Sequence, residues 1–412
     1  FKQKTAYEIV SRDWSSDVCS SDLLENQLKK LLLILGDQLS HESDALRAID
    51  RDRDEICMIE ASSEARHVWS NKARIALFLS AMRHFAEELR ERGFRVNYIY
   101  EADSIASALT QHFKKNSYQQ LLVTEPGEVR IRNDLRHLSE VSGVSIEFIP
   151  DNHFYCSIDD FKHWAAEKKE LRLEFFYRMM RKKHQVLMDP NGDPVGGQWN
   201  FDQDNRRPYP RQGPGFIDEP LWFEPDDITS SVIKWVQKTY PDHPGNLSHF
   251  NWPVTRDQAL KAMDHFMEHR LGNFGYYQDA MWTDTPFGWH SILSAALNLK
   301  LITPREVVDA ALMSYQRNQL ELSTVEGFIR QILGWREFVR GVYFLDMPKL
   351  ATDNHFKHTN QLPQWYWTGQ SRMKCMSDSV GQTIQYGYAH HIQRLMVTGN
   401  FALLDRKSTR LN

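Results

Sequence analysis

The chain has 412 residues, 41% of them hydrophobic and 25% charged, with a formal net charge of -4. Such a composition is typical of a globular protein large enough for two domains, and no apolar run reaches membrane-spanning length. The negative charge argues against a general nucleic-acid binder, so a DNA-binding surface would have to be a local basic patch. Four cysteines stand singly, which excludes a disulfide framework and indicates a reducing cytoplasm.

The two ends of the chain do not share the pattern of the rest. Residues 1–23 show no strand or helix periodicity, and they lack the apolar core of a signal peptide. We expect residues 1–23 and 406–412 to be non-native extensions that resemble translated adapter sequence. The native sequence is then expected to start near Leu24 and to be cut off after about Leu404.

Residues 24–150 alternate strand-like and helix-like segments. In Asn71–Arg92 the apolar residues recur three or four positions apart along one face, which predicts a helix. This alternation predicts an α/β fold, a doubly wound parallel sheet with helices on both faces. The predicted strands are Leu31–Leu35, Glu55–Glu60, Val96–Tyr100, Leu121–Thr124 and Ser145–Ile149.

The rest of the chain divides into a connector and a helical domain. In the connector, residues 151–250, the basic segment Phe161–His184 has a helical pattern, and the Pro- and Gly-rich stretch 189–220 is too polar to be helical. Residues 251–405 predict an all-α domain. Its helical periods lie at 257–271, 290–300, 304–317, 325–345 and 379–397.

Polar residues directly follow two of the predicted strands. Asp37 and Gln38 come after the first strand, and Glu64 comes just past the second. Ligands of open parallel sheets bind beyond the carboxyl ends of the strands, so these side chains can line one crevice. No GxGxxG is present, so the pattern is not a dinucleotide fingerprint. Ordinary turn chemistry explains the same residues equally well.

Two adjacent histidines stand in the otherwise apolar run from Tyr386 to Leu404. On a helix, His391 and Arg394 share a face, and His390 lies about 100° round from His391. Burying two imidazoles and a guanidinium is costly unless an anionic or polar group meets them. The pattern indicates either a functional site or core histidines with a structural ion pair, and it leaves both open.

Several long motifs occur in an order that resembles one family. They are LGDQLS at 35–40, SAMRHFAEELR at 80–90, VTEPGE at 123–128, PVGGQWNFDQDNR at 194–206, VEGFIRQILGWREF at 325–338, YWTG at 366–369 and YAHHIQRLMVTGNFALL at 388–404. This set resembles the iron–sulfur bacterial cryptochromes and photolyases, the prokaryotic (6-4) photolyases. The resemblance implies their architecture, an antenna-binding α/β domain followed by an all-α domain that binds FAD.

The resemblance implies a flavin site in the helical domain. The run from Phe287 to Ser294 would begin a helix whose hydroxyls and free N–H groups suit a pyrophosphate, although ordinary capping explains the serines as readily. A cation at Arg394 would favour the reduced, anionic flavin. The residues implied to contact FAD are His290, Ser291, Leu293, Ser294, Gln331, Trp335, Arg336 and Arg394.

The resemblance also implies an antenna chromophore. Asp37, Gln38 and Glu64 would contact 6,7-dimethyl-8-ribityllumazine, although His67 stands where the family more often has Tyr. Trp367 matches the inner electron-transfer aromatic of the family.

A metal cluster is implied by one cysteine. Cys375 matches the first of four thiolates that hold a four-iron, four-sulfur cluster in the family. Cys57 and Cys156 belong to other parts of the chain and are poor replacements, and Cys19 falls in the expected extension. We therefore expect this chain to lack the cluster that a full-length parent would contain.

The function implied by the resemblance is light-driven repair of (6-4) pyrimidine–pyrimidone photoproducts in UV-damaged DNA by a monomeric enzyme. His391, with His390, would give a proton to the flipped-out lesion. The alternatives are a cryptochrome-type blue-light photoreceptor and a flavoprotein without photochemistry. A basic segment with Arg181, Lys182 and Lys183 would contact DNA phosphates, and a solvated helix face explains it equally well.

Overall fold

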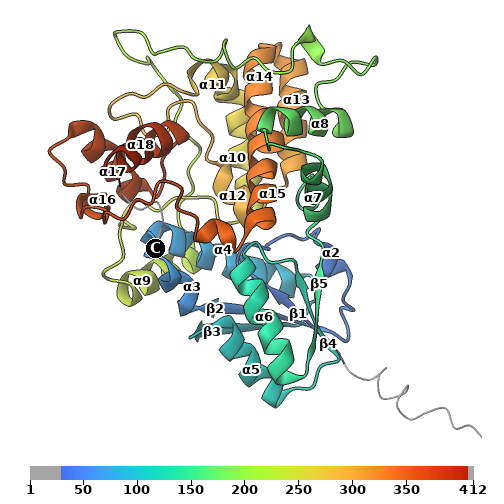
Figure 1. Ribbon diagram of the computed structural model, residues 1–412. Coiled ribbons are helices and arrows are strands. Elements are labelled where there is room, and N and C mark those ends of the chain that lie inside the picture. Colours follow the sequence, from blue (N-terminus) through green and yellow to red (C-terminus); the bar gives the residue numbers. More distant parts are fainter. Residues whose placement is uncertain (1–28, 407–412) are drawn as a thin grey trace, which may run out of the picture.

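The structure, a computed structural model, describes residues 29–406. An α/β part lies beneath a helical part in Figure 1, and the last helices stand to one side of the central ones. The predicted non-native ends fall outside the described residues except for Arg406. Within residues 29–406, no helix combines the length and the apolarity that a membrane crossing requires.

Five parallel strands form one sheet in the order β3-β2-β1-β4-β5. All five predicted strands are confirmed, with ends that shift by at most two residues. The strand order changes direction between β1 and β4, which is where open sheets of this kind leave a crevice for ligands. The strands are β1 (Lys30–Ile34), β2 (Glu55–Ala61), β3 (Val96–Ala102), β4 (Gln120–Thr124) and β5 (Ser145–Ile149).

Helices cover both faces of the sheet, as predicted for a doubly wound fold (Figure 1). Leu32 and Ile34 pack in the core that includes α4, whereas Leu31 and Leu33 pack in the core that includes α5 and α6. Side chains alternate along a strand, so an unbroken apolar run is buried on both sides. The helices of this part are α2 (Asp44–Arg47), α3 (Ser62–His67), α4 (Lys72–Glu91), α5 (Ile105–Lys115) and α6 (Val129–Ser142).

The second part is helical, and the boundaries proposed for its domains stay predictions. The predicted helices near 257–271, 304–317 and 325–345 are present, the last as a continuous run with a π-helical middle. The elements are α7 (Ile158–Ala166), α8 (Leu173–His184), α9 (Asp227–Thr239), α10 (Arg256–His269), α11 (Leu271–Tyr277), α12 (Leu293–Leu299), α13 (Pro304–Asn318), α14 (Leu322–Ile329), π-helical η2 (Arg330–Arg336), α15 (Glu337–Asp346), α16 (Trp365–Thr368), α17 (Lys374–Tyr386), π-helical η4 (Ile392–Gly399) and α18 (Asn400–Leu404), with single 3-10 turns η1 (Val195–Gly197) and η3 (Lys349–Ala351).

Two predicted helices are interrupted. The segment Phe161–His184 breaks into α7 and α8 because residues 167–170 are all charged and exposed, which leaves no apolar face to bury. The period 379–397 breaks at Gly387, whose φ of 64° is left-handed and whose N–H caps α17 by donating to Thr383. Helix α9 was not predicted, and it packs against α4.

Candidate functional site

A cavity of about 1000 Å³ lies beyond the carboxyl ends of the strands, between the sheet and the helical part. Asp37 and Glu64 both line it, so the prediction that they share one crevice is confirmed. Gly127 faces Asp37 so closely that a Cβ there would be 2.6 Å from a carboxylate oxygen. Val339 and Tyr343 of α15 complete the lining from the helical part.

Gln38 requires a correction, because it is buried and does not line the cavity. Its amide oxygen accepts from the Leu35 N–H at 3.3 Å, and its amide nitrogen donates to the Thr124 carbonyl at 2.9 Å. Both ends of the amide are used to tie the turn after β1 to β4. Gln38 therefore shapes the crevice and does not contact a ligand in it.

Charges of both signs surround the cavity. Glu64 pairs with Arg130 at 2.6 Å. Burial raises the pKa of Asp37, and the nearby Lys300 ammonium opposes part of that rise. Lys300 itself pairs with Asp151 at 2.8 Å, and neither side chain is more than 6% exposed. Asp37 thus takes up a proton more readily than a free carboxyl group does, which suits a polar, uncharged ligand.

Arg336 also lines this cavity, whereas His290, His390 and His391 of the helical part do not. Its guanidinium donates to the Leu297 carbonyl at 3.2 Å, lies 3.1 Å from Nε2 of His153 and covers the Phe154 ring at 4.3 Å. Burial lowers the pKa of Arg336 to about 10, and the negative charge of Glu337 offsets only part of this decrease. The structure groups Arg336 with Asp37 and Glu64, and its role as a flavin contact stays a prediction.

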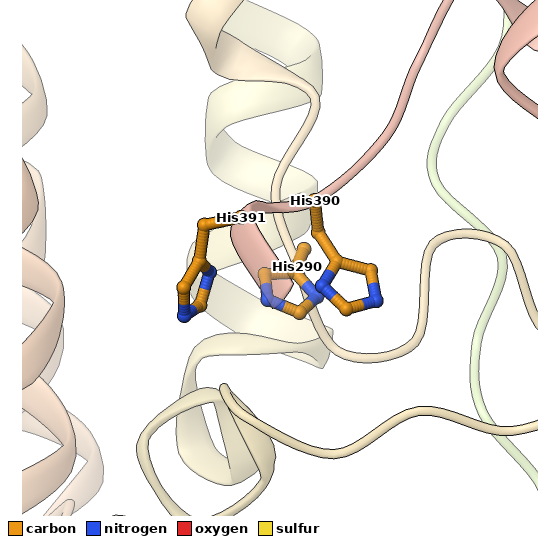
Figure 2. Close-up of side chains that lie close together, drawn as sticks. All are labelled: His290, His390 and His391. Atoms are coloured by element: carbon orange, nitrogen blue, oxygen red, sulfur yellow. The ribbon is translucent and has the colours of Figure 1, made fainter. Parts of the chain in front are cut away.

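Three histidines meet in the helical part, as Figure 2 shows. One ring nitrogen from each of His290, His390 and His391 lies within 4.8 Å of the others. The His290 and His390 rings stack with centroids 4.7 Å apart and planes 13° apart. His391 Nε2 is 3.0 Å from the Asp279 carboxylate. The predicted histidine pair therefore belongs to a larger group.

Two local features position these rings. His390 lies in the irregular segment after Gly387, and His391 is the first residue of the next helical run, so the two are not successive positions of one helix as predicted. The buried Arg270 donates to the backbone carbonyls of Asp218, Gly288 and His290, which fixes the loop before α12. Sequence reasoning missed Arg270 and Asp279, since neither carries a motif.

The protonation of the histidines follows from their burial. Burial and the neighbouring rings lower the pKa of His290 to about 4 and that of His390 to about 3, so both are neutral at pH 7. His290 Nε2 lies 2.9 Å from the Gln278 carbonyl and Nδ1 lies 3.3 Å from the Phe287 carbonyl. Carbonyls only accept, so the single hydrogen of the neutral ring is assigned to Nε2, at the shorter contact. His390 Nδ1 is buried and has no hydrogen-bond partner in the part of the chain that the structure describes. The His391 side chain is 41% exposed and can exchange its proton with solvent.

The helix that the sequence predicted to begin within residues 287–294 starts later in the structure than expected. Helix α12 begins only at Leu293, and its capping residue, Ile292, offers no side-chain hydrogen bond. Leu293 is buried in the core, Ser291 is half-buried and Ser294 is exposed. The serine hydroxyls therefore do not cap this helix, and a role in pyrophosphate binding stays a prediction.

The other predicted flavin contacts lie on the two π-helical segments. Gln331 donates to the Gly327 carbonyl at 3.0 Å, Trp335 is 46% exposed, and Arg394 is exposed. Next to His290, the indole N–H of Trp289 is buried and has no hydrogen-bond partner among residues 29–406. An exposed indole, an exposed guanidinium and an unpartnered buried donor are groups that suit an aromatic, anionic ligand such as a flavin nucleotide.

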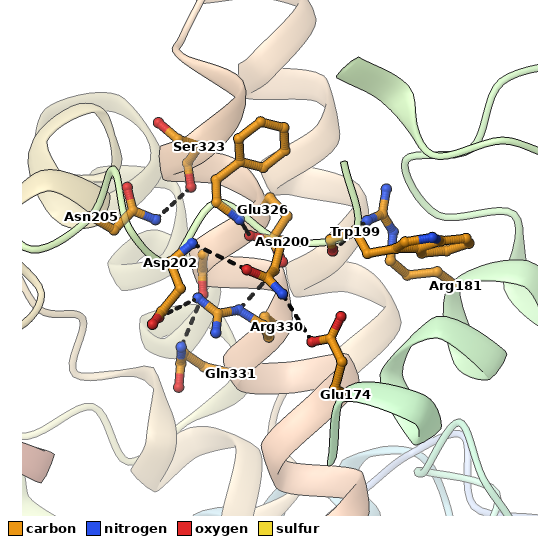
Figure 3. A network of polar contacts seen from close by, with 12 residues as sticks. Glu174, Arg181, Trp199, Asn200, Asp202, Asn205, Ser323, Glu326, Arg330 and Gln331 are labelled. Carbon is orange, nitrogen blue, oxygen red and sulfur yellow. Dashed lines mark hydrogen bonds and ion pairs between the residues drawn. The ribbon is translucent and has the colours of Figure 1, made fainter. Parts of the chain in front are cut away.

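The basic segment on α8 is only partly a surface feature. Arg181 is fully buried, and its guanidinium donates to the Trp199 carbonyl at 2.9 Å (Figure 3). It also donates to the carbonyls of Val186 at 3.2 Å and Leu187 at 2.5 Å. The predicted phosphate contact of Arg181 is therefore wrong. Lys182 and Lys183 are exposed, and Lys183 pairs with Asp160 at 2.9 Å.

The polar stretch around residues 199–205 is anchored from several sides, as Figure 3 shows. Asp202 pairs with Arg330 at 3.0 Å. The fully buried Glu326 accepts from the Phe201 N–H at 3.1 Å and lies 3.3 Å from Arg330. Asn200 donates to Glu174 of α8 at 3.0 Å. This network holds the irregular connector against α8 and α14.

Comparison with known proteins shows which family this chain resembles. A family model described as deoxyribodipyrimidine photo-lyase-related protein matches residues 32–252. The (6-4) photolyase of Agrobacterium fabrum (strain C58 / ATCC 33970) is 44% identical over 386 residues, which cover 92% of this chain and 75% of that protein. The chain belongs to the photolyase-related family.

Solved structures agree with the fold of this photolyase-related chain. A bacterial class III photolyase from Agrobacterium tumefaciens has a TM-score of 0.60 at 15% identity, over 91% of this chain and 73% of that one. A cryptochrome from Synechocystis sp. PCC6803 has a TM-score of 0.61 at 14% identity, over 93% and 76%. At such identities the likeness concerns the fold, and it confirms the predicted photolyase and cryptochrome architecture.

The cysteines of the photolyase-related chain occupy two kinds of environment. Cys375 is exposed in the first turn of α17. Cys57 and Cys156 are buried, and burial raises the pKa of both thiols to about 12, which disfavours the thiolates that iron binds. Cys57 is a core residue, and Cys19 lies outside the described residues. The ring of Trp367 lies 5.3 Å from that of Trp69.

Proposed function

We propose that this protein is a light-driven DNA repair enzyme that acts on (6-4) pyrimidine–pyrimidone photoproducts. The observation that carries the proposal is the hydrogen-bonded pair of His391 and Asp279 beside two neutral, buried imidazoles. The 44% identical relative that is named a (6-4) photolyase supports the same conclusion.

His391 is the proton donor in this proposal. The Asp279 carboxylate fixes the ring and stabilises the charged imidazolium, and the exposed part of the ring can reach a flipped-out lesion. His390 is a poor acid, since the pKa of about 3 leaves it neutral. We assign it to holding the lesion through its unpartnered Nδ1. The sequence analysis expected His391 and His390 to donate the proton together, and the present proposal assigns this donation to His391 alone.

The electron for repair would come from FAD, which in its reduced form supplies one electron on excitation by blue light and takes it back afterwards. Trp335 would stack against the flavin or its adenine, and Arg394 would favour its anionic form. Ser291, Ser294 and Gln331 offer hydroxyl and amide groups for the ribityl and phosphate oxygens.

The remaining cofactors and partners belong to the same proposal. The cavity lined by Asp37 and Glu64 would hold 6,7-dimethyl-8-ribityllumazine, and chromatography of heat-released chromophores tests this. Cys375 would be one of four cluster thiolates in a longer form of the protein, and iron analysis of that form tests it. Lys182 would face the phosphates of UV-damaged DNA. We infer a monomeric, cytoplasmic enzyme.

The test replaces His391 by Ala and measures blue-light repair of an oligonucleotide that contains one (6-4) photoproduct. Repair should fall at least about a hundredfold, the usual contribution of a general acid, at unchanged flavin content. The control is His84→Ala, which removes another histidine that faces a carboxylate, Asp226 at 3.1 Å, on the sheet side of the molecule. Wild-type repair rates in His391→Ala protein would remove this residue from the mechanism.

The same experiment separates the alternatives. A wild-type protein that photoreduces its flavin but repairs no lesion would be a cryptochrome-type photoreceptor. A protein whose flavin does not respond to light would be a flavoprotein without photochemistry.

A further inference from the structure

We propose that His290, His390 and His391 form a binding site for a divalent transition-metal ion with a preference for nitrogen ligands, such as Zn²⁺. Each ring offers one nitrogen, and the three ligand atoms lie within 4.8 Å of one another. The rings come from two segments far apart in sequence, the loop before α12 and residues 390–391 where the last helical run begins, and they lie side by side in Figure 2. Binding or release of the metal ion would leave the fold of the protein unchanged.

Hydrogen bonds on the outer side fix two of the ligands. His290 Nε2 donates to the Gln278 carbonyl at 2.9 Å, and His391 Nε2 faces the Asp279 carboxylate at 3.0 Å. Because an ionised carboxylate and a carbonyl only accept, the hydrogens sit on Nε2, where the contacts are shortest. Nδ1 of each ring then keeps its lone pair; in His290 this nitrogen also lies 3.3 Å from the Phe287 carbonyl, which offers it no hydrogen. Carbonyl- or carboxylate-backed imidazoles of this kind are the usual support of metal-binding histidines. Two adjacent residues, Gln278 and Asp279, supply that support.

The third ligand has no other partner. His390 is 6% exposed, and its Nδ1 makes no hydrogen bond within the described residues. Leaving a buried polar atom unpaired is unfavourable, and a metal ion bound there would remove that penalty.

The geometry favours a particular class of ion. Zinc–nitrogen bonds of about 2.0–2.1 Å place the nitrogens of a tetrahedral site about 3.4 Å apart. The three histidine nitrogens lie within 4.8 Å of one another, so side-chain movements of about 1 Å would bring them to that separation. Three imidazoles suit Zn²⁺, Cu²⁺ and Ni²⁺ better than Mg²⁺ or Ca²⁺, which prefer oxygen. The half-exposed His391 leaves the fourth position open to water.

Occupation of the site would stop the proposed chemistry. A metal ion on His391 holds the lone pair that the ring needs to pick up a proton, and it fills the space in front of His390. Zinc should therefore inhibit repair, and this consequence alone rests on the proposed function. Metal binding itself does not depend on it.

The test is a Zn²⁺ titration in competition with a chromogenic chelator, in the dark and without DNA, on the protein as purified. A Cys375→Ser background removes the exposed thiol, which also binds zinc. We expect one site per chain whose affinity falls at least about tenfold in His390→Ala and in Asp279→Asn, the second of which keeps all three ligands. The control is His269→Ala on α10, which removes one ring of the stacked pair His265 and His269, 4.6 Å apart, and should leave the affinity unchanged.

Unchanged zinc affinity in both His390→Ala and Asp279→Asn would overturn the proposal, and so would loss of the site in His269→Ala alone. His390→Gln, which keeps a polar side chain of similar size, repeats the test should the alanine variant fold poorly. Because no light, lesion or repair is involved, failure of this test leaves the repair proposal standing. Failure of the His391→Ala repair test likewise leaves zinc binding to be judged by its own titration.

Discussion

At the scale of single residues, neighbours on α8 have opposite roles that their sequence does not reveal. Arg181 and Lys182 look alike in a basic run, yet Arg181 is fully buried and Lys182 is exposed. The Arg181 guanidinium satisfies three backbone carbonyls where the chain leaves α8, next to Gln185 and Leu187, which both have left-handed φ angles. Its charge serves the fold and not a ligand.

We predict that Arg181→Ala lowers the free energy of unfolding by about 3 kcal/mol, because hydrogen bonds from a buried charged donor are lost and carbonyls remain unpaired. Lys182→Ala should change it by less than about 0.5 kcal/mol, as surface substitutions do. Urea denaturation followed by far-UV circular dichroism measures both. Equal midpoints for the two variants would contradict the structural role of Arg181.

The functional residues were predictable only where a motif or a strand end marks them. Asp37 and Glu64 follow strands, so their meeting at one cavity could be inferred from topology. His390 and His391 stand out as polar residues in an apolar run. Asp279 lies 112 positions from the histidine that it contacts, and no local pattern announces such a partner.

At the scale of elements, periodicity predicts which face is buried but not where a helix is interrupted. The strands and the long helix α4 were correct because their apolar spacing continues through the whole element. The break at Gly387 was missed because the apolar positions keep their spacing across it, while one left-handed glycine redirects the backbone. That break is what brings His390 out of the helix and against His290.

Helix packing depends on one close approach between α11 and α14. Gly275 lies so near Thr324 that a Cβ would overlap the Thr324 backbone Cα and hydroxyl. We predict that Gly275→Ala costs about 3 kcal/mol, because the helices have to move apart. The matched control is Gly381→Ala within α17, where a Cβ would have open space and should stabilise by about 0.5–1 kcal/mol. Thermal unfolding of both variants checks the prediction, and similar shifts in one direction would disprove it.

At the scale of the whole molecule, a buried ion pair joins the sheet to the helical part. Asp151 follows β5, Lys300 follows α12, and their charged atoms are 2.8 Å apart. Both line the cavity of about 1000 Å³, so the pair also sets the charge of its wall. Burial alone would raise the pKa of Asp151, but the charge and hydrogen bond of Lys300 outweigh it and lower the pKa below its ordinary value.

A lowered pKa in the folded state ties stability to pH with a definite sign. The unfolded chain takes up a proton on Asp151 more readily than the folded one does. The stabilisation is therefore fully present above the ordinary carboxyl pKa of about 4, and it is lost as the pH falls through the lower folded value. We predict that Asp151→Asn costs about 3–5 kcal/mol at pH 7, because the Lys300 charge stays buried without its partner.

The pH dependence of that loss distinguishes the pair from an ordinary packing effect. The difference between wild type and Asp151→Asn should be constant from about pH 8 to 5. It should shrink below about pH 4, where Asp151 is protonated first in the unfolded chain and, at still lower pH, in the folded protein. The control is Asp257→Asn, since Asp257 and Lys261 are also 2.8 Å apart but are 72% and 61% exposed. This variant should cost less than about 1 kcal/mol at any pH. Chemical denaturation across this pH range tests the claim, and a difference independent of pH would mean that Asp151 stabilises the contact between the two parts by shape and not by charge.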